Sequence, residues 1–537
     1  MRDKTFSASH DRLIRKRIVE FLLIAAIILL AAWLRFYNLR SSPGWYSDEG
    51  SFINVAENLS AGKSQYFAIQ GSTLLVGRLP LFMIVMSWLF NLFGTDILVG
   101  RSLAAACGIL NILLVYLMVR KFSNFALAVT AALIYSIYPW AVFYNRMALT
   151  YNMLGFFGFL SVCSLWMALD QNSKRWMIIC GISVSLALAT DYLGIVFISL
   201  IILVVLIYRW KWLPFTLIWI TAPIALILLP LAISDPSGLI SDLRYTFLRV
   251  EIPPGFQIIN IVLHYGELIR REIWIAIGLI GLFLIHDRRL RWMFIYICFV
   301  TILLVVRSLP PVGRNYHHLI HLFPYISIGI ASLFIQAVQY LFADIDGALV
   351  NIWNRLLIIQ VRGQAAIFRV TRATLFSMVV VVFLISPFIW MLTSDFVGIS
   401  SSVYSFITKE NDHNLADVRI VQETLSFLES NLSPADVVIA SPQILWAVPA
   451  LKADFAQTIA FNEGDAGVLQ ILDRNRFIYD CSTEAAKFVV LDPLVFDYAT
   501  LLVPDLRKVI VEVKTWNLAY QTDGYLVYIN PLYGKMR

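Results

Sequence analysis

The stretch RIVEFLLIAAIILLAAWLRFY (residues 17–37) consists almost entirely of apolar side chains and directly follows the basic sequence RLIRKR (residues 12–17). An α-helix needs about 20 such residues to cross the hydrocarbon core of a bilayer. The run is too long for the apolar core of a secretory signal peptide, and no small-residue cleavage site follows it. It therefore predicts an uncleaved first transmembrane helix, preceded by a basic cytoplasmic N-terminus over residues 1–17.

The whole chain shares this apolar character. Of its 537 residues, 59% are hydrophobic and 14% are charged, and the mean hydropathy is +0.75. Membrane proteins have this composition and soluble domains do not. The net charge is +7, but Lys and Arg occur in short clusters between apolar runs, as in cytoplasmic loops. These features predict contact with membrane lipids and argue against nucleic-acid binding.

Apolar runs of spanning length recur through residues 18–393, and we expect about eleven transmembrane helices there. The predicted spans lie near residues 18–37, 97–119, 125–143, 150–169, 176–191, 193–208, 212–233, 273–286, 292–306, 319–341 and 375–393. The basic clusters between them then fall on the N-terminal side of the membrane, as the positive-inside rule requires. The apolar segment 79–94 would invert this pattern if it crossed, so we predict a half-buried helix there.

After the last predicted span the composition becomes mixed polar and apolar. Residues 414–432 have the period of an amphipathic helix, and four short apolar runs are typical of strands. These runs are DVVIAS (436–441), KFVVLD (487–492), KVIVEV (508–513) and YLVYIN (525–530). We expect residues 394–537 to form a small extracytoplasmic α/β domain that recognises a substrate or acts as a lid. Residues 342–373 are expected to lie as a basic helix on the inner leaflet.

The predicted topology gathers four segments at the outer face of the membrane, namely residues 38–96, 144–152, 234–272 and 307–321. They carry the adjacent carboxylates Asp48 and Glu49 together with a set of cationic or titratable side chains, Arg78, Arg146, Arg314 and His317. A carboxylate that acts as a base, opposite arginines that bind phosphate, is a minimal site for displacing a phosphate leaving group. Asp191 falls on the same face.

Simpler interpretations of the same residues stay open. An acidic pair in the first turn of a helix is also a favourable helix cap, because it complements the helix dipole. Each arginine on its own is often an interfacial anchor that reaches the lipid head groups. Asp191 lies in the short turn ATDYLG (189–194), where a carboxylate is often only solvated.

Two longer stretches resemble a known family. LRFYNLRSSPGWYSDEGSFINVAENLSAGK (34–63) and GRLPLFMIVMSWLFNLFGTDILVGRSLAAACGILNILLVYLMVRKF (77–122) are similar to the N-terminal region of the membrane-embedded GT-C glycosyltransferases. Within that group they resemble the protein O-mannosyltransferases and the bacterial aminoarabinose transferases. The match consists of the acidic pair, a basic residue before Leu79-Pro80-Leu81, and Arg146-Met147-Ala148, with a weaker continuation over residues 314–330.

The resemblance implies a GT-C fold and transfer of a sugar from a polyprenyl-phosphate donor to an acceptor hydroxyl at the outer face of the plasma membrane, with inversion. Asp48 would be the general base and Glu49 its supporting neighbour. The donor phosphate would contact Arg78, Arg146, Arg314 and His317, and the substrates would contact Tyr151, Tyr316 and Asp191. Whether the acceptor is a lipid, a glycan or a protein stays open.

The sequence departs from the family at one position that matters for metal binding. Relatives carry an acidic residue about five positions after the arginine, where this chain has Tyr151. The second acidic role is therefore missing or has moved to Asp191 or Glu251. Because no His or Cys cluster matches a metal site either, we predict no obligatory cofactor and leave a divalent metal open. The alternative function is a transporter or lipid flippase, which would place charges at mid-helix.

Overall fold

A computed structural model describes residues 2–71, 79–234, 236–240, 266, 270, 272–308, 316–358, 385–401, 404, 415–463, 474–501 and 504–533. Three predicted positions, Arg78, Arg314 and Glu251, lie outside the described residues, as does much of the loop 234–272. The same holds for residues 359–384, which include part of the last predicted span and of the predicted inner-leaflet helix.

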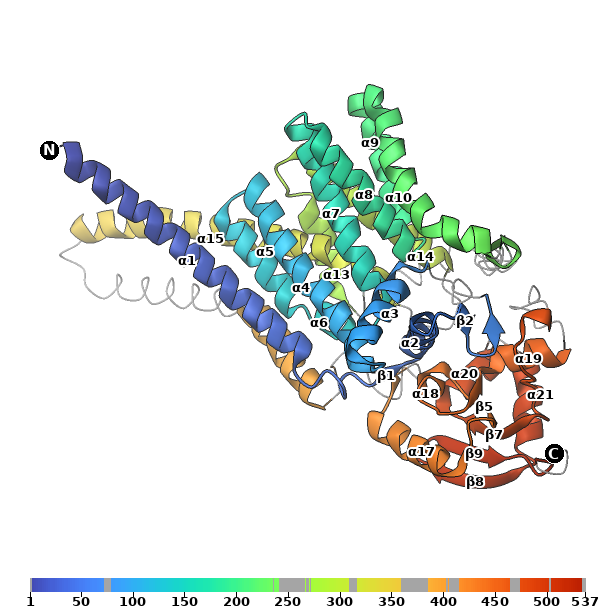
Figure 1. Ribbon diagram of the computed structural model, residues 1–537. Helices are drawn as coiled ribbons and strands as arrows, with labels where there is room; N and C mark the ends of the chain where they lie inside the picture. Colours follow the sequence, from blue (N-terminus) through green and yellow to red (C-terminus); the bar gives the residue numbers. More distant parts are fainter. Residues whose placement is uncertain are drawn as a thin grey trace.

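Helices make up most of the described chain before residue 402 (Figure 1). In order they are α1 (Arg2–Phe36), α2 (Ser47–Ser60), α3 (Leu81–Phe93), α4 (Ile97–Phe122), α5 (Phe125–Ile137), α6 (Pro139–Asn145), α7 (Thr150–Asp170), α8 (Lys174–Thr190), α9 (Gly194–Arg209), the short η1 (Trp210–Trp212), α10 (Leu213–Ser234), α13 (Ile273–Leu282), α14 (Arg288–Ser308), η2 (Tyr316–Leu322), α15 (Phe323–Ile358) and a helix over 385–401.

Several of these helices are suited to a bilayer. Among the described residues, five segments are long and apolar enough to cross a membrane, and a sixth joins them if the bent pair α5 and α6 counts as one span. The five are Ile14–Phe36, Ile97–Phe122, Thr150–Asp170, Gly194–Pro230 and His317–Tyr340. The chain is therefore a multi-pass membrane protein. The number of eleven spans and the orientation of the termini stay predictions.

The predicted spans 193–208 and 212–233 fall within one apolar segment, Gly194–Pro230, and two other predicted spans differ in length or shape from the observed helices. Residues 273–286 form a helix only over Ile273–Leu282, which at 1.5 Å per residue covers about 15 Å, half of the hydrocarbon core. Residues 125–143 do not form one straight helix, because the chain bends by 58° between α5 and α6. Tyr138 at the bend is extended, as a residue before a proline usually is.

The apolar segment 79–94 contains the short helix α3. Its 13 residues span about 20 Å, less than the hydrocarbon thickness of about 30 Å. Phe82, Met83 and Met86 are fully buried in it, and Phe82 packs against Phe52 of α2 with ring centroids 6.4 Å apart. The helix thus supports α2 from within the segment 38–96.

The C-terminal part contains a five-stranded sheet in the order β6-β5-β7-β9-β8. The strands β6 (Leu451–Ala453), β5 (Val437–Ile439) and β7 (Ala486–Leu491) are parallel to one another. The strand β9 (Tyr525–Ile529) is antiparallel to β7, and β8 (Asn517–Thr522) is antiparallel to β9. The helices here are α17 (Val418–Asn431), α18 (Pro442–Leu445), α19 (Phe455–Glu463), α20 (Pro493–Leu501) and α21 (Pro504–Val513).

The strand predicted over KVIVEV (508–513) is wrong, because these residues belong to α21. The short run of apolar residues Val509, Ile510 and Val511 suggested a strand. However, Leu506, Val509, Ile510 and Val513 are spaced by three and four residues, and all four are buried. Val511, which a strand would have buried, is 67% exposed. The helical period therefore decides the structure.

One pair of very short strands connects the two parts of the chain. The strand β1 (Trp45–Tyr46) pairs with β4 (Leu415–Ala416), at the start of the C-terminal part. The strands β2 (Gln65–Tyr66) and β3 (Ile69–Gln70) form a hairpin between α2 and α3. Figure 1 shows the C-terminal sheet at one end of the molecule, next to α2, β1 and β2.

Candidate functional site

The acidic pair lies in the first turn of α2, and its two side chains differ in environment. Glu49 is fully buried, whereas the side chain of Asp48 is 34% exposed. Neighbouring residues on a helix point about 100° apart, so one faces the protein interior while the other faces away from it. The two carboxylates therefore differ in which groups they can contact: Glu49 faces the protein interior, and Asp48 is accessible to solvent.

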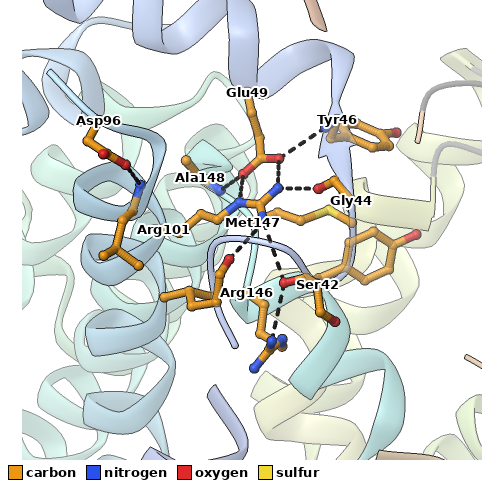
Figure 2. Close-up of polar contacts among 12 residues, drawn as sticks. Ser42, Gly44, Tyr46, Glu49, Asp96, Arg101, Arg146, Met147 and Ala148 are labelled. Carbon is orange, nitrogen blue, oxygen red and sulfur yellow. Dashed lines mark hydrogen bonds and ion pairs between the residues drawn. The ribbon is translucent and has the colours of Figure 1, made fainter. Parts of the chain in front are cut away.

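Glu49 is saturated by hydrogen bonds from the protein (Figure 2). Arg101 of α4 donates from Nε to Oε1 at 2.9 Å and from Nη2 to Oε2 at 2.7 Å. The backbone N–H of Ala148 donates to Oε1 at 2.7 Å, and that of Tyr46 donates to Oε2 at 3.1 Å. The bond from Tyr46 caps α2, so the helix-cap interpretation applies to Glu49. Glu49 thereby joins α2, α4 and the segment after α6.

Arg146 follows α6 and is fully buried. Its Nη1 donates to the carbonyl of Leu34 at 2.7 Å, and its Nη2 donates to those of Tyr37 at 2.8 Å and Ser42 at 3.2 Å. The guanidinium thus binds the backbone of the loop that precedes α2. This geometry suits a structural clamp, because the groups expected to hold a donor phosphate are already directed at carbonyl oxygens.

Two further buried arginines complete this clamp. Arg101 also donates to the carbonyls of Leu39, at 2.9 Å, and Gly44. Arg35, at the end of α1, donates to Asn145 Oδ1 at 3.0 Å and to the carbonyl of Ser136 at 2.9 Å. Arg101 and Arg146 hold carbonyls within residues 37–44, and Arg35 joins the end of α1 to α5 and α6. These three arginines, the clamp, thus fix the segment that leads to Asp48.

Asp48 lies beside His317 of η2, a residue distant in sequence. Asp48 Oδ2 is 3.7 Å from His317 Nε2, and the other ring nitrogen, Nδ1, is 3.1 Å from the hydroxyl of Tyr46. Tyr46 thereby fixes the orientation of the imidazole that faces Asp48. The structure thus brings together Asp48 and His317, two residues that the predicted topology assigned to the same face.

Aromatic rings surround the histidine. Tyr151, near the start of α7, lies with its ring centroid 5.4 Å from that of His317 and 4.9 Å from that of His318. Tyr316 begins η2, directly before His317. Tyr151 thus belongs to the same cluster as Asp48 and His317.

Asp191 is fully buried and is not a solvated turn residue. Its Oδ1 accepts a hydrogen bond from the backbone N–H of Leu193 at 3.0 Å, which stabilises the turn between α8 and α9. Its Oδ2 is 3.4 Å from the hydroxyl of Thr150, the residue before Tyr151. Asp191 therefore supports the start of α7 and reaches the site through Thr150.

Two contributors to the site could be recognised in the sequence but were not. Arg101 is a charge inside the apolar stretch of α4, and such residues usually have a buried partner or a function. Tyr46 directly precedes the acidic pair, but its contact with His317 bridges 271 positions. Among the described residues, no group of three or more His, Cys, Asp or Glu side chains is arranged to hold a metal ion.

Comparisons with known proteins identify the class of fold. Residues 78–233 match the family model described as dolichyl-phosphate-mannose-protein mannosyltransferase. A comparison with curated protein sequences gives no match. Two solved structures are similar over nearly the whole chain, and the family model and these structures together confirm the predicted GT-C fold.

The first similar structure is ArnT from Cupriavidus metallidurans bound to undecaprenyl phosphate, at 14% identity and a TM-score of 0.57, covering 96% of this chain and 99% of that one. The second is the oligosaccharyltransferase AglB from Archaeoglobus fulgidus in complex with an inhibitory peptide and a dolichol-phosphate. It is 17% identical with a TM-score of 0.53, and the match covers 97% of this chain and 75% of that one.

Proposed function

We propose that the protein is a glycosyltransferase that moves a sugar from a polyprenyl-phosphate donor to an acceptor hydroxyl, with inversion at the sugar. The observation that carries this proposal is the different environment of the two carboxylates. Glu49 is buried and fully hydrogen-bonded to the protein, while Asp48 is partly exposed and lies 3.7 Å from His317. The proposed polyprenyl-phosphate donor is supported by the matching family model and by the lipid phosphates named with both similar structures.

Asp48 is the general base in this mechanism. Its carboxylate takes the proton of the acceptor hydroxyl as the hydroxyl oxygen attacks the anomeric carbon. The bond between that carbon and the lipid phosphate oxygen breaks, and the phosphate leaves with the bonding electrons. Attack from the side opposite the leaving group inverts the sugar. No obligatory metal is required, because cationic side chains balance the phosphate charge.

The other residues of the site have supporting roles. His317, oriented by Tyr46, holds the carboxylate of Asp48 in place. Arg78 and Arg314 bind the departing phosphate, and Tyr151 and Tyr316 contact the substrates. Glu49, Arg146 and Asp191 are positioning residues, because the carboxylate oxygens of Glu49 and Asp191 and both Nη atoms of Arg146 bind the protein's own groups.

The domain arrangement follows from the same proposal. Residues 1–17 lie in the cytoplasm, residues 18–393 form the transmembrane GT-C domain, and residues 394–537 form an α/β domain outside the cytoplasm. The protein resides in the plasma membrane, and its acceptor is a lipid, a glycan or a protein.

The test is sugar transfer from radiolabelled polyprenyl-phosphate monosaccharides in membranes that contain the wild type or Asp48→Asn. We expect transfer by the wild type and a loss of at least about 100-fold in the variant. The control is Asp96→Asn, because Asp96 pairs with Arg40 at the surface. Equal transfer by Asp48→Asn would refute the role of Asp48, and no transfer by any protein with any donor would favour the transporter alternative.

A further inference from the structure

The carboxyl ends of the parallel strands in the C-terminal domain meet at one edge of the sheet. Asp454 follows β6, Ser441 follows β5 and Asp492 follows β7, and all three are buried. In open α/β sheets, small ligands bind outside this edge. Here the edge faces another part of the same chain, since α18 begins directly after Ser441 and packs against α2. The chain itself occupies the region where such a sheet usually holds a ligand.

The contact between α18 and α2 is a backbone contact. A Cβ atom added to Gly50 would lie 2.0 Å from the carbonyl oxygen of Pro442 and 3.0 Å from the ring of Trp446. Only a glycine fits at this distance. Trp446 also packs against Trp45, with ring centroids 4.9 Å apart. Gly50 lies two residues after Asp48, so the C-terminal domain touches the helical turn that carries the proposed base.

The β2–β3 hairpin makes a second, polar contact with the same edge. The hydroxyl of Tyr66 donates to Asp454 Oδ2 at 2.9 Å. Gln457 donates from Nε2 to the carbonyl of Tyr66 at 3.1 Å and accepts at Oε1 from the N–H of Ala68 at 3.2 Å. Burial raises the pKa of Asp454, and the hydrogen bonds from Gln457 and Tyr66 oppose this shift. These buried groups satisfy one another, which makes the contact specific.

Further contacts extend this interface. The backbone N–H of Ile478 donates to the carbonyl of Ala68 at 2.9 Å, and Ile69 forms an antiparallel bridge with Phe477. Lys452 Nζ lies 3.7 Å from Glu57 Oε2, near the end of α2. The interface therefore runs along α2 and its hairpin, and separating the two parts would break all of these contacts.

We propose that the C-terminal domain is a fixed positioning element for Asp48, with Gly50, Tyr66 and Asp454 as its positioning residues. This inference rests on the proposed function and extends it, because it chooses between the two roles that the sequence left open. A lid must leave the site in each cycle, and this domain stays docked. An error of about 1 Å in the place of a reacting group can cost about 100-fold in rate, so a rigid support behind α2 has a catalytic effect.

A cross-link distinguishes a fixed element from a lid. Ile69 and Phe477 are paired across an antiparallel bridge, and the Cα atoms of such pairs are about 4.5 to 5.5 Å apart, within reach of a disulfide. We would combine Ile69→Cys with Phe477→Cys and compare oxidised with reduced enzyme. A fixed domain predicts transfer rates within about twofold of each other. A loss of about tenfold or more on oxidation, reversed by a reductant, would overturn the proposal. Each single substitution serves as control.

Substitutions in the interface test positioning directly. We expect Gly50→Ala and Tyr66→Phe to lower kcat, by about 10- to 100-fold for Gly50→Ala, with the donor KM within about twofold of wild type. Hydrogen exchange of the backbone amides in α2 should rise in both variants. The matched control is Tyr533→Phe, whose hydroxyl donates to Asp436 within the C-terminal domain. Wild-type kcat and wild-type exchange in both variants would contradict the proposal.

The exchange measurement also separates the two proposals. It needs no donor, so it reports on the docking of α2 even if the wild type transfers no sugar. Absent transfer together with raised exchange in Tyr66→Phe would refute the proposed function and keep the docking. Transfer that depends on Asp48, together with unchanged exchange and rates in the interface variants, would keep the function and refute the positioning role.

Discussion

Arg101 and Glu49 form a bidentate ion pair in which both side chains are inaccessible to solvent, with N–O distances of 2.9 and 2.7 Å. The pair connects the first turn of α2 with the first turns of α4. Because neither charge is hydrated, each is stabilised by the other, and the pair is stable only while both residues are present. Losing one partner of such a pair leaves a buried charge, which costs about 3 to 5 kcal/mol.

Arg101→Met should therefore destabilise the protein by about 3 to 5 kcal/mol. Glu49→Gln should cost a similar amount, because it leaves the charge of Arg101 buried without its carboxylate. The measurement is thermal unfolding of the purified protein in detergent, followed by tryptophan fluorescence. The control is Arg40→Met, which removes an exposed pair with Asp96 and should cost about 1 kcal/mol or less. Equal unfolding temperatures for Arg101→Met and Arg40→Met would contradict this account.

A substitution at Arg146 distinguishes its structural role in the clamp from a role in binding the donor phosphate. Its guanidinium binds four carbonyls, one in the last turn of α1 and three in the segment between α1 and α2. Arg146→Lys should therefore lose the planar arrangement of donors that serves them. We expect a lower unfolding temperature and a lower kcat, while the donor KM of the residual activity stays within about twofold of wild type. Arg78→Ala, by comparison, should raise the donor KM. A large rise of KM in Arg146→Lys with normal stability would restore the phosphate-binding role.

The sequence predicts some parts of this structure well, and the reasons are local. Apolar runs predict the membrane helices, and the dipeptide Tyr138-Pro139 predicts the break between α5 and α6, because a residue before proline avoids the helical conformation. The acidic pair is also visible in the sequence. Its division into one structural and one exposed carboxylate is not, because Arg101 and the N–H of Ala148 come from 52 and 99 residues away. Such contacts depend on tertiary packing, which no local pattern encodes.

His317 and Tyr46 should act as one unit with Asp48. Removing the imidazole in His317→Gln leaves the carboxylate without its oriented neighbour, and we expect kcat to fall by about 10- to 100-fold at normal expression. Tyr46→Phe should have a smaller effect of the same kind. The double variant should be no worse than His317→Gln alone, because both changes disturb the same contact. The measurement is kcat and donor KM in the transfer assay.

The control for this series is His286→Gln, which changes an exposed histidine between α13 and α14. It should transfer sugar at the wild-type rate. Additive losses in the double variant would mean that Tyr46 and His317 act independently, and the orienting role of Tyr46 would then be wrong.

The burial of Asp492 predicts that the stability of the C-terminal domain depends on pH. Burial raises the pKa of this carboxyl from 3.8 to about 6, although Ser441, Gln443 and the N–H of Val495 donate hydrogen bonds to it. Below about pH 4 both the folded and the unfolded chain are protonated. Between about pH 4 and 6 the unfolded chain releases its proton first, so stability falls as the pH rises, by up to about 3 kcal/mol for a shift of about two units.

Asp492→Asn removes this ionisation and can keep the hydrogen bond from Val495. We therefore expect the variant to unfold at a higher temperature than the wild type at pH 7 to 8, and the difference to shrink as the pH falls to about 4. Unfolding of the full-length protein in detergent across this range measures the effect, with Asp523→Asn at an exposed turn as control. In this variant the amide NH2 can donate to the hydroxyl of Ser441, which directly precedes α18. We therefore expect α18 to keep its contact with Gly50 and the variant to keep transfer activity at neutral pH. Parallel pH profiles for wild type and Asp492→Asn would show that this carboxyl is ionised at little cost, contrary to its burial.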